Sequence, residues 1–232
     1  MAVENLVLVR GLRDTRGTLA EWNAAPWAVM RRWLLGAGAV TAGLLLAVLV
    51  IANVAKPDPT PIILPGLNSP ASLDAVRHVL FRNSLVLALH SMACVAGFIA
   101  GSSLPLEAQR HSGLWRWVHE KAGPLAIAFV VGATGFSLCT QAYVLGNAAA
   151  TLAWQGDVSP TLLLAGILPH AIPELIGLFL PLAAWIIASR RRDWHELLAA
   201  TFVTTTVAAP VLVIAAFLEV YVSPHVILAL RG

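Results

Sequence analysis

The residues of this chain best suited to chemistry lie together in the stretch 166–175, GILPHAIPEL. An imidazole, His170, and a carboxylate, Glu174, are four residues apart, so on a helix they share one face. Ionisable side chains at bilayer depth are costly and normally face protein or water rather than lipid. Two prolines, Pro169 and Pro173, remove backbone donors, and the carbonyl groups that they free need other partners. The stretch predicts either a functional site or a polar pair that only holds helices together, and both interpretations stay open.

Further polar residues are expected at a similar depth in neighbouring apolar runs. Arg82 and Asn83 open one run, and Asn147 closes another. Glu219 lies about one helical turn before the end of a third. Polar groups in apolar surroundings are costly unless they satisfy one another. The sequence therefore predicts one intramembrane polar cluster, made of Arg82, Asn83, Asn147, His170, Glu174 and Glu219.

Two contacts are expected within this cluster. Arg82 with Glu219 is a candidate ion pair, and Asn83 with Glu174 or His170 is a candidate hydrogen bond. Such contacts would join helices that are far apart in the sequence.

A metal ion is an alternative occupant of the cluster, because His170, Glu174 and Glu219 are all possible ligands. The spacing typical of a catalytic zinc helix is absent, since neither His119-Glu120 nor His195-Glu196 has a second histidine three residues on. We therefore expect no bound metal and no cofactor, and we keep a membrane metalloenzyme as a minor alternative.

Catalytic motifs of other kinds are also missing from the sequence. It contains no GxSxG nucleophile motif, Walker loop, Rossmann glycine motif or kinase signature. Cys94 and Cys139 lie in apolar runs without an adjacent base, so a small buried hydrophobe is the expected role of each. No residue is predicted to be catalytic.

The composition identifies the elements that must position these residues as membrane helices. Apolar residues make up 58% of the chain and charged residues 12%, and the mean hydropathy is +0.78. A soluble helical protein would need far more polar surface. The net charge of +3 is small, and no Lys/Arg-rich block is present, so nucleic acid is not an expected partner.

Five apolar runs approach the length of about 20 residues that spans a bilayer. The expected class is an all-α polytopic bundle. Residues 1–33, which are rich in Arg and Trp, are expected to form a cytoplasmic or interfacial segment whose helix lies at the membrane surface. Residues 34–232 form the predicted membrane domain, with spans at about 34–54, 79–104, 122–146, 161–188 and 196–222.

The sequence also predicts the structure of the segments between the spans. The Pro-rich stretch 56–66 is expected to be an extended linker. Ser69 and Pro70 suit the cap and the first position of the next helix. Polar loops are expected at about 105–121 and 147–160, and the last ten residues are expected to be a short tail.

The distribution of positive charge predicts the orientation of the spans. With residue 1 in the cytoplasm, eleven of the fifteen Lys and Arg residues fall on inside segments. Lys56, Arg77, Arg82 and Arg231 remain outside. Because cytoplasmic loops carry an excess of Lys and Arg, the N-terminus is predicted inside and the C-terminus outside.

Three segments of the chain resemble the stage II sporulation protein M family. The first is LFRNS at 80–84, since members of that family open the second span with a polar, Asn-containing start. The second is LPHAIPEL at 168–175, which is similar to the Pro-His-Gly-x-x-Glu-Leu of the family, with Ala171 in place of Gly. The third is AAFLEVYVSP at 215–224, close to the Ala-x-x-x-Glu-x-x-x-x-Pro segment that closes the family's pattern.

This resemblance implies a five-span helical protein of the bacterial cytoplasmic membrane. In spore formers the family anchors cell-wall hydrolases at the septum during engulfment, and some relatives are associated with transport ATPases. The leading expectation is a non-enzymatic scaffold or assembly subunit, which could form a homodimer in the lipid bilayer. The alternative is a permease-like subunit that works with a separate ATPase, or a carrier that uses His170, Glu174 and Glu219 as its site.

Overall fold

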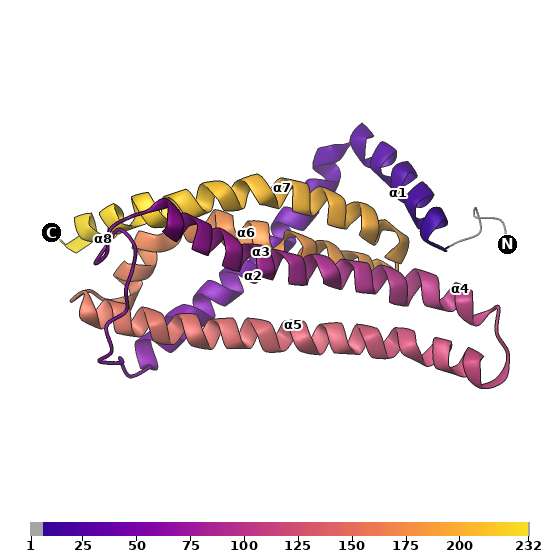
Figure 1. Cartoon of the computed structure of the whole chain (residues 1–232), viewed down its shortest axis with the longest axis horizontal. Coiled ribbons are helices and arrows are strands. Elements are labelled where there is room, and N and C mark those ends of the chain that lie inside the picture. The colour runs from indigo at the N-terminus through magenta and orange to yellow at the C-terminus, as the bar shows by residue number, and fades with distance from the viewer. Residues whose placement is uncertain (1–6, 232) are drawn as a thin grey trace. The chain divides into compact units, whose positions relative to one another are not determined.

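Helices make up most of the described part of the chain, residues 7–231 of the computed structural model, and Figure 1 colours them from indigo to yellow along the sequence. Within that range the strand-like pairing is a single isolated bridge, between Pro65 and Ser69. In chain order the elements are α1 (Val7–Ala24), α2 (Pro26–Val54), α3 (Leu73–Phe98), η2 (Ile99–Ser103), α4 (Leu104–Ala108), α5 (Gly113–Gln155), α6 (Pro160–Arg191), η3 (Trp194–Glu196), α7 (Leu197–Phe217), η4 (Leu218–Val222) and α8 (Ser223–Arg231). The predicted all-α class is confirmed, while residues 1–6 and 232 of the two predicted regions lie outside the described range.

Five helical stretches are long and apolar enough to cross a membrane, as the sequence predicts. They are Pro26–Val54, Leu73–Ser102, Gly113–Gln155, Pro160–Arg191 and Trp194–Leu230. Each exceeds the length of about 20 residues that a bilayer requires. The chain is therefore a multi-pass membrane protein by the length and composition of its helices.

The N-terminal region contains α1 and the beginning of α2. Pro26 is the first residue of α2, a position where its missing N–H costs nothing. The rings of Trp22 and Trp33 pack edge to face across this break, with their centroids 5.1 Å apart. The predicted N-terminal helix is confirmed, and its place at the membrane surface stays a prediction.

The two predicted loops at 105–121 and 147–160 are wrong over most of their length. The chain leaves regular helix only at 109–112 and 156–159, and α5 runs without a break for 43 residues (Figure 1). Polarity does not end a helix whose backbone bonds continue, and Arg116 and Glu120 support the first turns of α5 through an i, i+4 ion pair of 2.8 Å. Hydropathy marks the part of a helix that suits lipid, and it says little about where the helix ends.

Residues 55–72 contain no helix, which confirms the extended linker predicted for the Pro-rich stretch. The predicted cap at Ser69 is wrong, because its carbonyl accepts the N–H of Gly66 at 2.8 Å in a turn. Ser72 takes the capping role instead, and its Oγ accepts the N–H of Ala75 at 3.2 Å at the start of α3.

The predicted C-terminal tail is also helical. The π-helical segment η4 follows α7 and leads directly into α8 (Figure 1). A second π-helical segment, η2, joins α3 to α4. Each of these segments is followed, at the second position, by a proline: Pro105 after η2 and Pro224 after η4.

The prolines give a physical reason for the wider π turns. The N–H of Leu104 bonds to Ile99, five residues back, and the next residue, Pro105, has no N–H to donate. Pro105 therefore cannot donate a hydrogen bond to the carbonyl of Ala100. By the same reasoning Pro224 cannot donate one to the carbonyl of Glu219, while the N–H of Ser223 bonds to Leu218.

The chain divides into two compact units whose boundaries fall inside the long helices. The first unit takes in the chain up to Ala37, together with Leu87–Thr134 and Phe179–Val207. The second takes in Gly38–Val86, Gly135–Leu178 and the chain from Ala208 onward. All six residues of the predicted polar cluster therefore belong to the second unit.

Close packing in the first unit depends on a glycine of α3. A Cβ atom on Gly97 would lie 2.7 Å from Nε1 of Trp185 and 2.8 Å from Cδ1 of Leu197. Nearby, the buried Sγ of Cys94 donates to the carbonyl of Pro181 at 3.1 Å. The predicted buried role is confirmed for Cys94 and is wrong for Cys139, whose side chain is exposed on α5.

In the second unit, α3 packs on the end of the last long helix through a small apolar core. Val76, Ala216 and Val220 are its buried members. The apolar face of α3 therefore lies beside η4, the segment that carries Glu219.

Candidate functional site

The candidate site lies in the second unit, where α6 meets the segment η4–α8 in antiparallel register. A Cβ atom on Gly166 would lie 2.9 Å from Cγ1 of Ile227, so the two helices are in close contact there. Four residues further along α6, His170 meets Ser223, which is four residues back from Ile227. Four residues further again, the charge of Glu174 interacts with that of Glu219. Both helices thus present residues of i, i+4 spacing to each other.

A buried hydrogen bond joins His170 to Ser223. The distance between Nδ1 of His170 and Oγ of Ser223 is 2.5 Å, and the two residues are 9% and 2% exposed. Hydropathy places Ser223 in a tail, so the sequence does not predict this contact. The sequence signal that could identify this contact is the spacing of polar residues. Ser223 follows Glu219 by four residues, just as Glu174 follows His170.

The carboxyl of Glu174 lies among charged and polar groups from two other helices. Glu219 of η4, Asn83 of α3 and Arg82 of α3 all act electrostatically on it. Within the described chain, neither Oε2 of Glu174 nor Nδ2 of Asn83 has a hydrogen-bond partner, although both atoms are buried. The two side chains are thus close in space without the geometry of a hydrogen bond.

Arg82 supplies the positive charge of this group from an exposed position. It acts on both Glu174 and Glu219, but the ion pairs within 4.0 Å among residues 7–231 do not include it. The predicted ion pair between Arg82 and Glu219 is therefore a longer-range attraction in this structure.

The hydrogen bond described for the Asn147 side chain lies within its own helix, and no described contact joins Asn147 to the other five predicted residues. Its amide donates to the carbonyl of Tyr143 at 2.7 Å, one turn back on α5. Back-bonding of this kind satisfies a polar side chain within its own helix. The structure therefore brings together Arg82, Asn83, Glu174 and Glu219, and it attaches His170 to them through the helix pair.

The Pro-rich linker passes beside the same turn of the last helix. Gly66 has φ +81°, and a Cβ atom there would lie 2.5 Å from the carbonyl oxygen of Val220 and 2.7 Å from Cγ of Pro224. Both contacts flank Ser223 in the sequence. A residue with a side chain at position 66 would be strained in its backbone and would clash with this turn.

Hydrogen bonds to the end of α5 hold the other half of the linker. The side chain of Gln155 donates to the carbonyl of Thr60 at 2.9 Å and accepts the N–H of Ile62 at 3.2 Å. Oγ1 of Thr151 accepts the N–H of Asp58 at 3.0 Å. The N–H of Thr60 donates to Asp58, and this bond lowers the pKa of that exposed carboxyl from its ordinary value.

The side chains of this site are of types that bind charge and protons. Over residues 7–231, no three His, Cys, Asp or Glu side chains are grouped closely enough to hold a metal ion. The site is made of two carboxyls, an imidazole, an amide and a guanidinium. It can therefore exchange a proton, attract a cation between the carboxyls, or fix the helices that carry it.

One of the comparisons with known proteins finds a similar family for part of the chain. No curated protein and no solved structure matches the chain. A family model described as Stage II sporulation protein M matches residues 116–224. This range contains two of the three segments that resemble the family, 168–175 and 215–224, and these segments form the contact between α6 and η4. The third segment, at 80–84, lies before the matched range. Residues 116–224 of the chain are therefore similar to the stage II sporulation protein M family.

Proposed function

We propose that the protein is a non-enzymatic scaffold or assembly subunit of a complex in a bacterial cytoplasmic membrane. The observation that carries this proposal is the exposure of α5. In its most apolar stretch only 6% of the residues are buried, against 67% in that of α6. A helix that contributes so little to its own fold is available to bind another membrane protein.

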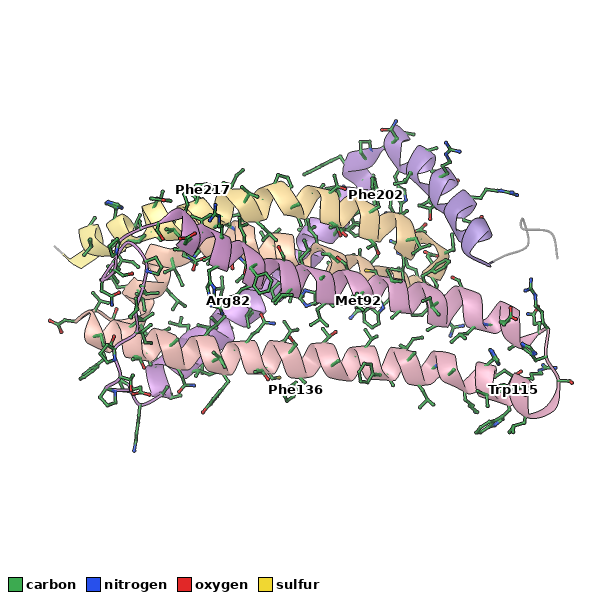
Figure 2. All side chains as sticks on the ribbon, viewed as in Figure 1. Arg82, Met92, Trp115, Phe136, Phe202 and Phe217 are labelled. Atoms are coloured by element: carbon green, nitrogen blue, oxygen red, sulfur yellow. The ribbon has the colours of Figure 1, made fainter. Side chains whose placement is uncertain are left out.

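The side chains along α5 have the composition of a helix-binding surface. Large apolar groups stand out from it, among them Phe136, which is 76% exposed (Figure 2). A Cβ atom added to Gly132 or Gly135 would meet no other helix of the described chain within 4 Å, so the backbone is accessible there. Small residues of this kind let a second helix approach closely within a bilayer.

The test is purification of the full chain in mild detergent, followed by identification of the proteins that co-purify. Gly132→Leu should remove the partner, because the added side chain keeps the second helix at a distance. Gly43→Leu is the matched control, since Gly43 is an equally open glycine of α2. The proposal would be overturned if both variants retain the same proteins or lose them alike.

The identity of the partner decides between the two functions. A cell-wall hydrolase, or an adaptor for one, supports the scaffold. Recovery of a transport ATPase would replace the scaffold with the permease-like alternative. A second copy of this chain alone would show a homodimer that uses α5.

The specific observation that favours the permease-like alternative is the position of Glu174. Its buried carboxyl oxygen lacks a hydrogen-bond partner within the described chain and lies close to a second carboxyl. Such a group is costly in an apolar helix unless it serves a proton or a cation. Transport coupled to this group would disappear in Glu174→Gln, while assembly with partners through α5 would persist.

A further inference from the structure

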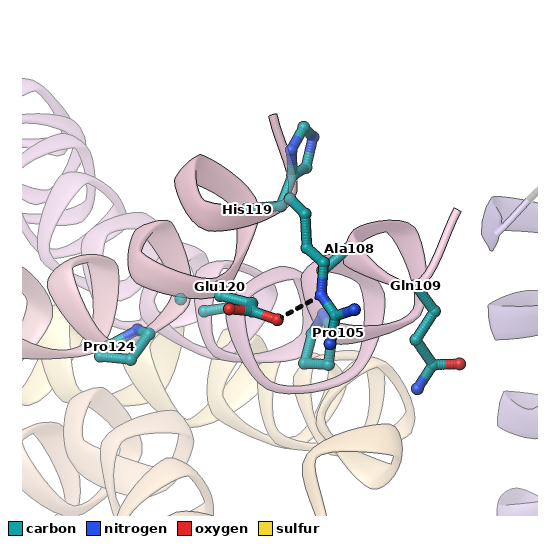
Figure 3. A pocket seen from close by; sticks show the side chains of 9 residues that line it. Pro105, Ala108, Gln109, His119, Glu120 and Pro124 are labelled. Carbon is teal, nitrogen blue, oxygen red and sulfur yellow. Dashed lines mark hydrogen bonds and ion pairs between the residues drawn. The ribbon is translucent and has the colours of Figure 1, made fainter. Parts of the chain in front are cut away.

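The first unit contains a cavity that shares no lining residue with the polar site. It occupies about 270 Å³ where η2 and α4 meet the first turns of α5. Figure 3 shows its lining side chains, including Pro105, Ala108, Gln109, His119, Glu120 and Pro124. Apolar groups close its wall, and one cation and one anion stand at its rim.

The cation and the anion are Arg116 and Glu120. Nε of Arg116 donates to Oε1 of Glu120 at 2.8 Å, the ion pair marked by the dashed line in Figure 3. Among the described contacts, this bond leaves the terminal nitrogens of the guanidinium and the second carboxylate oxygen free to bind another molecule. Both side chains are about half exposed, so a ligand can reach them from outside.

A backbone acceptor completes the polar lining. Pro105 has no N–H to donate to the carbonyl of Ala100, and a Cβ atom on Gly123 would lie 2.8 Å from that oxygen, so the absence of a side chain there leaves space beside it. All three residues line the cavity. The cavity therefore offers donors for an anion at Arg116 and Gln109, and acceptors for an ammonium at Glu120 and Ala100.

The surroundings of the cavity suit a lipid. Trp115 and Trp117, which are 68% and 56% exposed, stand on the same turns of α5, and tryptophan is enriched where a membrane meets water. Just past Pro124, the exposed side chains of Leu125 and Phe129 continue along α5 as an apolar surface. A headgroup in the cavity would leave its acyl chains on that surface.

We propose that this cavity binds the headgroup of an aminophospholipid, with the phosphodiester at Arg116 and the primary ammonium at Glu120 and the carbonyl of Ala100. An anionic headgroup alone would meet the Glu120 carboxylate, and a quaternary ammonium could not donate hydrogen bonds to it. A lipid that carries both a phosphodiester and a primary amine satisfies both charges.

The test measures binding to the delipidated full chain in detergent by native mass spectrometry. The probes are phosphatidylethanolamine, phosphatidylcholine, phosphatidylglycerol and soluble glycerophosphoethanolamine. Phosphatidylethanolamine should bind about tenfold more tightly than the other two lipids, a difference typical of one charge-assisted hydrogen bond. Glu120→Gln should remove the preference over phosphatidylcholine, and Arg116→Gln should weaken the binding of all three lipids.

The matched control is Arg77→Gln, which removes an exposed arginine paired with Asp74 on α3 and should leave binding unchanged. If a single variant fails to fold, the exchange Arg116→Glu with Glu120→Arg keeps the pair and the net charge, and it should still lose the preference. Equal binding of the three lipids to the parent chain, or an Arg77→Gln variant as weak as Arg116→Gln, would overturn the proposal. If soluble glycerophosphoethanolamine binds as tightly as phosphatidylethanolamine, the ligand is a free headgroup. The proposal that the cavity binds a membrane lipid would then be wrong.

Discussion

The hydrogen bond between His170 and Ser223 joins α6 to α8 where both residues are buried. Ser223→Ala leaves a ring nitrogen of His170 without its partner, so the free energy of unfolding in detergent should fall by about 1–3 kcal/mol. The measurement is thermal unfolding of the purified chain. Ser84→Ala, at an exposed serine of α3, is the control and should change little. Equal stability of the two variants would mean that the contact contributes nothing to the fold.

Glu174 is the residue at which a structural role and a functional role can be separated. Glu174→Gln keeps the size and polarity of the side chain, so the variant should insert and unfold near the temperature of the parent. Glu174→Leu removes the group on which Arg82 and Asn83 act, and it should lower the free energy of unfolding by about 1–3 kcal/mol. Thermal unfolding in detergent compares the three proteins. A Leu variant as stable as the parent would show that Glu174 does not organise these helices.

At the scale of helices, the sequence predicts the number of elements better than their ends. The five apolar runs match five long helices because each must supply enough apolar residues to cross a bilayer. The start of α5 is not predicted by hydropathy, because polar residues continue a helix when an ion pair such as that of Arg116 and Glu120 supports it. Hydropathy does not predict the π-helical segments either. Each precedes a proline that lacks a backbone N–H, and a missing donor does not change the hydropathy of the sequence.

The linker 55–72 is held by its own turn hydrogen bonds and, in its first half, by side chains of α5. Gln155 makes two of its anchoring bonds, so Gln155→Ala should release the stretch around Thr60 and Ile62. Amide hydrogen exchange should become faster there by about tenfold or more, because each lost bond favours local opening. Gln141→Ala is the control, since Gln141 bonds to Ser137 on its own helix. Unchanged exchange in Gln155→Ala would show that other contacts hold the linker.

At the scale of the whole molecule, the sequence supplies most of the candidate site but not the contacts within it. His170, Glu174 and Glu219 follow from charge within apolar runs, and the i, i+4 spacing of the first two follows from the helix itself. Which helix faces which is decided by tertiary packing, and for that reason sequence reasoning omits Ser223 and includes Asn147. Asn147 satisfies its polarity locally, through a bond to its own helix that one sequence cannot reveal.

Orientation in the membrane is the property of the whole chain that the charges predict most directly. The N-terminus is expected inside and the C-terminus outside, because the excess of Lys and Arg lies on the segments that this topology places in the cytoplasm. Single cysteines at positions 60, 112, 157 and 192 report this, because all four side chains are exposed in segments that join the helices. Gln155, which is near the same loop, is left unchanged because its side chain anchors the linker.

The labelling begins from a chain in which Cys94 and Cys139 are replaced by serine, and a membrane-impermeant maleimide is applied to intact cells. Cysteines at 60 and 157 should react from outside, and those at 112 and 192 should react only after the membrane is opened. Five spans require an odd number of crossings between the termini, so the segments must alternate sides. Reaction of positions 60 and 192 from the same side would refute this topology.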